Sequence, residues 1–118
     1  IGTGMSESSG IFTFPSTGFY FITFSTCLYR VNNDAAMNTE IDVTTDNSSY
    51  TTVARGYTGT GSLASNYNAT YTSAFVDVTD VSNVKVRFNI SSNNQNNGVV
   101  GSSTMNTTHM TFLRMGDT

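Results

Sequence analysis

The segment from Gly10 to Ile22 constrains the fold more than any other part of the chain. It reads Gly-Ile-Phe-Thr-Phe-Pro-Ser-Thr-Gly-Phe-Tyr-Phe-Ile, so an extended strand here carries apolar side chains on both of its faces. Pro15 and Gly18 let the backbone bend sharply before this strand. We expect one face to fill a core and the other face to meet a partner chain.

The composition limits the function classes mainly by exclusion. With 118 residues the chain is long enough for one domain with a real core and too short for two. Only 11% of the residues are charged, the net charge is -3, and the five Lys and Arg residues form no cluster. Binding to nucleic acid through its phosphates is therefore not expected. No apolar run approaches the roughly 20 residues that cross a bilayer, so no membrane insertion is expected.

The pattern along the chain predicts short strands separated by turns. Residues 1–9 are rich in Gly and Ser and are expected to form a flexible lead-in or linker, whereas residues 10–118 form the domain. After the long strand at residues 19–29, residues 37–45 alternate apolar with polar side chains, which predicts a strand with one wet face. The remaining strands are expected at residues 50–55, 73–78, 83–90 and 108–115. The strands at 73–78 and 83–90 are predicted to pair through a turn at 80–83, and a loop is expected over residues 56–68.

Gly10, Phe12, Pro15, Gly18 and Tyr20 stand at the spacing Gly-x-Phe-x-x-Pro-x-x-Gly-x-Tyr-x-Phe, and Ile22 replaces the final Phe. In this motif the chain resembles the globular head of complement component 1q and the wider tumour-necrosis-factor-like jelly rolls. Residues 76–88 are similar to the penultimate hairpin of that family, and residues 111–116 are similar to the closing strand of its viral members. The resemblance implies an all-β jelly-roll sandwich of about ten short antiparallel strands that assembles as a homotrimer.

The alternation of side chains along the aromatic strand agrees with a partner chain. Tyr20, Ile22 and Phe24 share one face, and Phe19 and Phe21 share the other. We therefore expect a trimer interface at Phe19, Phe21 and Phe112. The alternative is a central strand that is buried on both sides within one chain. The expected core residues are Phe12, Tyr20, Ile22, Phe24, Val76, Val78, Val84, Val86 and Phe88.

No set of residues predicts an enzyme, a cofactor or a metal centre. His109 is the only histidine and stands in no recognisable catalytic motif, so it is interpreted as a structural or surface residue. Asp77 and Asp80 have the oxygen ligands that Ca²⁺ prefers, but a solvated turn explains them equally well. Cys27 is alone and is interpreted as a small core residue, with a reactive thiol as the alternative.

The leading functional hypothesis is a structural protein of the virion surface, most simply of a bacteriophage, with no enzymatic activity. Its trimeric head would act in host attachment at the tip of a tail fibre, or would decorate a capsid. Its partners would be a host receptor or glycan, or a capsid protein. The contact surface is expected in loops at residues 32–34, 56–68 and 91–101, above all at Asn93, Asn94, Gln95, Asn96 and Asn97. The alternative is a secreted ligand or lectin-like module of the complement and tumour-necrosis-factor type.

Overall fold

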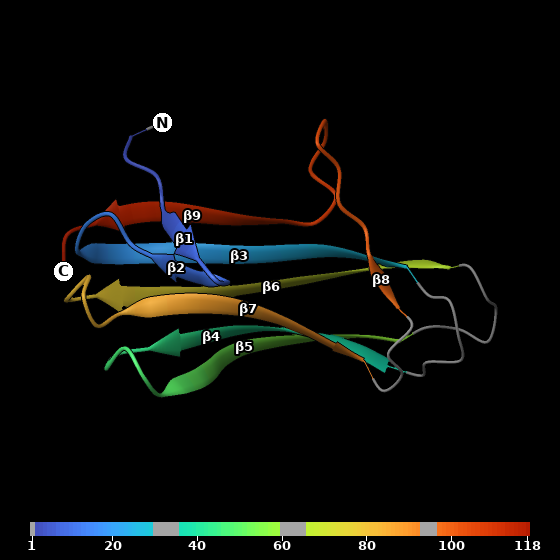
Figure 1. Cartoon of the computed structure of the whole chain (residues 1–118), viewed down its shortest axis with the longest axis horizontal. Coiled ribbons are helices and arrows are strands. Elements are labelled where there is room, and N and C mark those ends of the chain that lie inside the picture. Colours follow the sequence, from blue (N-terminus) through green and yellow to red (C-terminus); the bar gives the residue numbers. More distant parts are fainter. Residues whose placement is uncertain (1, 30–35, 60–65, 93–96) are drawn as a thin grey trace.

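The chain folds into two antiparallel β-sheets (Figure 1). A computed structural model describes residues 2–29, 36–59, 66–92 and 97–118. The strands in these ranges are β1 (Ser6–Ser8), β2 (Ile11–Thr13), β3 (Gly18–Tyr29), β4 (Ala36–Thr44), β5 (Tyr50–Gly59), β6 (Tyr67–Val78), β7 (Lys85–Ser92), β8 (Gly98–Val99) and β9 (His109–Gly116). None of these ranges contains a helix, and hence none contains a helix that could cross a membrane. The all-β class is confirmed, and the two sheets are consistent with the expected sandwich.

The first sheet has five strands in the order β1-β2-β7-β4-β5. In the second sheet β6 pairs with one edge of β3, whereas β8 and β9 both pair with the other edge. β9 pairs with residues 19–25 of β3, and β8 pairs with Leu28 and Tyr29. Figure 1 shows β9, β3 and β6 lying side by side, with the two chain ends at the same end of the long axis. The aromatic strand β3 is thus the centre of the second sheet.

Gly18 lets β3 begin close to the last strand. Its φ of 140° lies in the region that favours glycine. A Cβ atom at this position would stand 2.7 Å from Nε of Arg114 and even closer to the carbonyl oxygen of Gly116. The glycine of the sequence motif therefore allows β9 to pair with β3 up to Gly116.

The expected pairing of residues 73–78 with residues 83–90 is wrong. β6 belongs to the second sheet and β7 to the first, so the turn between them leads the chain from one sheet to the other. The Asp80 carboxylate fixes this turn by accepting hydrogen bonds from the Ser82 backbone N–H at 2.7 Å and from Nδ2 of Asn83 at 2.9 Å. Alternation predicted that both strands bury every second side chain, but alternation does not reveal the sheet to which a strand belongs.

Two other boundaries differ from expectation. Within the lead-in, Ser6–Ser8 forms β1 and pairs with β2 through a tight turn, in which Ser9 and Gly10 have φ of 53° and 80°. β5 continues to Gly59 and β6 begins at Tyr67, so most of the described part of the expected 56–68 loop is strand. Glycines at 56 and 59 and the polar residues before Tyr67 resemble turn signals, but backbone pairing with β4 holds residues 56–59 extended, and pairing with β3 holds Tyr67 and Asn68 extended.

The core between the sheets has an apolar part and a threonine part. The apolar part holds Tyr20, Ile22, Phe24, Val76, Val78, Val84 and Val86 as expected residues, together with Phe14, Ile41 and Val43. Phe12 and Phe88 are partly buried and pack against it. In the threonine part, Oγ1 of Thr70 lies 2.8 Å from Oγ1 of both Thr26 and Thr39, which links β6 with β3 and with β4 of the other sheet. Because these buried hydroxyls bond to one another, their burial carries little penalty.

Candidate interaction surface

The outer face of the β6-β3-β9 sheet carries large apolar side chains in solvent. We define the aromatic face by its most exposed members that the strand register places on this side, with the exposed fraction of each: Phe75 74%, Tyr67 67%, Tyr71 62%, Leu113 53% and Phe19 44%. Of the outward positions described on β3 and β6, only Asp77 is charged. Several large apolar side chains exposed on one sheet face are uncommon on monomeric soluble proteins and mark interaction sites.

The register of the strands brings these side chains together. Phe21 stands opposite Phe75 on β6 and opposite Leu113 on β9. The Phe21 and Phe75 rings lie 4.9 Å apart, and the Tyr29 and Tyr67 rings lie 5.0 Å apart, both measured between centroids. Cross-strand aromatic pairs of this kind fix the rings to the sheet. The aromatic face is therefore a preformed surface along most of β3.

Two of the three residues expected at an interface lie on this face, and the third does not. Phe19 is exposed and Phe21 is half-buried beside Phe75. Phe112 points into the sandwich, with its ring centroid 5.6 Å from that of Phe12 and 5.8 Å from that of Phe88. Phe112 and Leu113 are adjacent apolar residues, so alternation alone could not decide which one points outward. Leu113 takes the position expected for Phe112.

The outer face of the other sheet is built from polar side chains that bond to one another. We define the polar face by the outward side chains of β7, β4 and β5: Asn38, Glu40, Asp42, Tyr50, Thr52, Arg55, Tyr57, Arg87, Asn89 and Ser91. Nη2 of Arg55 lies 2.7 Å from Oε1 of Glu40, and its Nη1 donates to the Tyr57 hydroxyl at 3.2 Å. These contacts, the Tyr57 hydrogen bond first and then the Glu40 charge, raise the pKa of Arg55 above its ordinary value.

Asp42 lies on the face of residues 37–45 that was expected to be exposed to solvent, but it is buried. Its residue is only 3% exposed, and its carboxylate accepts from Thr52 Oγ1 at 2.8 Å, Arg87 Nε at 3.1 Å and Asn89 Nδ2 at 2.5 Å. The Arg87 guanidinium also covers the Tyr50 ring, 4.2 Å from its centroid. A buried carboxylate is tolerated because these donors satisfy it. The donors come from β5 and β7, which local alternation in β4 could not reveal.

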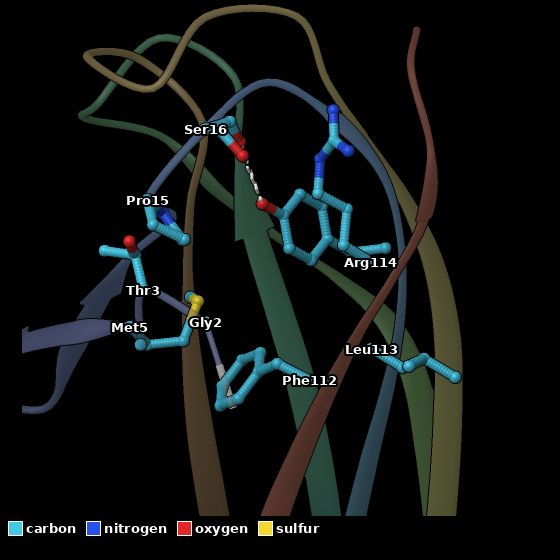
Figure 2. Close-up of a pocket in the computed structure, with 10 residues that line it drawn as sticks. Gly2, Thr3, Met5, Pro15, Ser16, Phe112, Leu113 and Arg114 are labelled. Carbon is cyan, nitrogen blue, oxygen red and sulfur yellow. Dashed lines mark hydrogen bonds between the residues drawn. The ribbon is translucent and has the colours of Figure 1, made fainter.

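A hollow of about 820 Å³ lies between the N-terminal segment and β9 (Figure 2). Met5, Pro15 and Phe112 give it apolar walls, and at its rim the Tyr20 hydroxyl donates to the Ser16 carbonyl oxygen at 3.0 Å. Arg114, the one charged residue in its lining, donates from Nε to the Thr17 carbonyl oxygen and pairs with Asp117. The hollow thus presents apolar walls and an arginine that is already paired.

The remaining candidates occupy structural positions. His109 begins β9, and its Nδ1 is buried with no hydrogen-bond partner. Cys27 is half-buried on the outward side of β3, not in the core, and its backbone N–H donates to Oγ1 of Thr108. In the described part of the chain, no three His, Cys, Asp or Glu side chains gather as metal ligands. Of the expected contact loops, residues 32–34 and Asn93, Asn94, Gln95 and Asn96 lie outside the described residues, and Asn97 directly precedes β8.

A scan of protein-family models and a search of curated proteins gave no match to this sequence.

Proposed function

We propose that this chain is the jelly-roll head of a homotrimeric, non-enzymatic protein of the virion surface. The aromatic face is the observation that carries this proposal. Five large apolar side chains, each at least 44% exposed, lie on one sheet face. A second copy of the same chain is the simplest cover, because a face with almost no charge binds by apolar burial and an obligate interface is rich in such residues.

The trimeric state and the location on a virion are inferred from the sequence resemblance. The motif from Gly10 to Tyr20 resembles that of trimeric jelly-roll heads, and the closing residues 111–116 are similar to those of viral members. In such an assembly the aromatic faces meet near the threefold axis. The polar face, on the opposite side of the sandwich, then points outward. This arrangement suits attachment to a host from a tail fibre, or decoration of a capsid.

Exchange of a predicted contact loop tests the attachment role. Replacement of Asn93 to Asn97 by a Gly-Ser linker of equal length removes many neutral hydrogen-bonding groups and leaves the strands of the aromatic face unchanged. We expect the protein with the exchanged loop to keep the trimer mass. We expect it to attach more weakly, either to host cells as part of the particle or to the capsid. Undiminished adsorption by an intact trimer would reject this loop as the contact. Absence of the protein from purified particles would reject the virion location.

A further inference from the structure

A shallow hollow lies along β5, at the edge of the first sheet. Its volume is about 410 Å³, it is widely open to solvent, and all of its lining residues belong to β5: Thr52, Val53, Ala54, Arg55 and Tyr57. The pairing of β4 with β5 shifts here: Ile41 pairs with Ala54 and Asp42 pairs with Thr52, which leaves Val53 as the extra residue of a bulge. Bulges redirect side chains at sheet edges and often adjoin binding sites. The hollow therefore lies where the edge strand is locally distorted.

Two exposed side chains give the hollow an apolar surface. Tyr57 is 69% exposed and Val53 is 49% exposed. The hydrogen bond from Nη1 of Arg55 to the Tyr57 hydroxyl holds the ring beside the guanidinium. A ring that is held before a ligand arrives loses little conformational entropy on binding. The Tyr57 ring is thus an exposed platform that one hydrogen bond orients beside a polar group.

The charges of the hollow are already compensated. The Arg55 guanidinium lies 2.7 Å from the Glu40 carboxylate, and Oδ1 of Asp42 accepts from the Thr52 hydroxyl. The guanidinium carries five N–H donors and the Thr52 oxygen still accepts, so hydrogen-bonding capacity remains for a ligand. Because Arg55 is neutralised by Glu40, this capacity suits uncharged hydroxyl groups better than a phosphate or a carboxylate.

We propose that this hollow binds a neutral hexopyranose unit of a glycan. The C–H face of the sugar ring packs on Tyr57 and Val53, and its hydroxyls bond to Arg55 and Thr52. This inference rests on the proposed attachment function and names the class of its ligand. The hollow lies on β5, an edge strand of the sheet opposite the aromatic face. The proposal therefore includes that it stays open when the aromatic faces assemble.

Titration of the intact protein with the methyl glycosides of glucose, galactose, mannose and N-acetylglucosamine tests the proposal. We expect at least one of them to shift the backbone amide signals of Arg55 and Tyr57 in nitrogen-15 NMR spectra, with a Kd on the order of 1 mM. Tyr57→Ala should weaken binding at least 10-fold, and Tyr57→Phe should keep most of it because the ring remains.

Tyr67→Ala is the matched control, because Tyr67 is equally exposed but lies on the aromatic face. It should leave the sugar affinity unchanged, even if it weakens assembly. Absence of shifts at Arg55 and Tyr57 with all four glycosides at about 50 mM, fifty times the expected Kd, would overturn the proposal. Shifts that persist in Tyr57→Ala would also overturn it. So would the finding that β5 binds an extended peptide as an added strand and binds no sugar. A monomer that binds sugar would reject only the trimer, and a trimer that binds none would reject only the sugar site.

Discussion

The outward side chains of the two sheets meet the solvent in opposite ways. On β7, β4 and β5 the outward side chains bond to one another, and even the buried Asp42 has three donors. On β6, β3 and β9 the large outward side chains are mostly aromatic or aliphatic, and several of them remain in solvent. A self-satisfied polar surface is stable in water without a partner, whereas an apolar surface gains free energy when it is covered. This difference is the reason for proposing that one face serves display and the other serves assembly.

The largest effect is expected from the core that both faces share. Phe24→Ala removes a ring that is 3% exposed and packs 5.0 Å from the Phe88 ring across the sandwich. We expect the free energy of unfolding to fall by about 3–5 kcal/mol, as for other large-to-small core substitutions. Denaturant unfolding measures it. Phe75→Ala, which trims an exposed ring, should cost far less in a monomeric state, and an equal loss would contradict the assignment of faces.

A charge on the aromatic face is expected to break assembly while leaving the fold. Phe75→Glu places a carboxylate among apolar side chains that the proposed interface buries, and one such central residue is commonly worth about 2–4 kcal/mol of association. Sedimentation velocity over a dilution series measures the change. Arg55→Glu on the polar face is the control and should leave the mass unchanged. Dissociation by the control and not by Phe75→Glu would reverse the roles of the faces.

Removal of the central acceptor is expected to weaken the polar face. Asp42→Ala leaves Thr52, Arg87 and Asn89 without the carboxylate that they share, and we expect a loss of about 1–3 kcal/mol in unfolding free energy. The exposed Asp77→Ala on the other sheet serves as its control and should be nearly neutral. Equal unfolding midpoints for both variants would show that the Asp42 network contributes nothing to stability.

The smallest effect concerns the turn that joins β4 to β5. Asp46 accepts from the backbone N–H groups of Ser49 at 2.7 Å and Ser48 at 2.9 Å, and these hydrogen bonds, with that from Thr44, lower its pKa well below the ordinary value. Its contribution is therefore present above the ordinary aspartate pKa and is lost as the pH falls through the lowered folded value. Asp46→Asn should be slightly less stable than the parent at pH 7, and the difference should shrink in strong acid. A difference that grows in acid would contradict this sign.

Alternation along the sequence predicted faces well and sheets poorly. It separated Tyr20, Ile22 and Phe24 from Phe19 and Phe21, because successive strand residues point to opposite sides. It could not assign β6 and β7 to different sheets, since both bury every second residue in the same core. The sequence did not predict the full aromatic face, because residues 56–68 were expected to form a loop and the strand that contains Phe75 was expected to begin only at residue 73. Tyr67, Tyr71 and Phe75 stand four positions apart in the sequence. This even spacing is the signal that places them on one face of one strand.

The mass of the protein in solution tests the central claim most directly. The aromatic face is proposed to be covered by copies of the same chain, so light scattering at micromolar concentration should give three times the 12.7 kDa chain mass for the parent protein. The same measurement on Phe75→Glu should give the single-chain mass at the lowest concentrations. A parent protein that remains a stable 12.7 kDa monomer, with its aromatic face in water, would contradict the account.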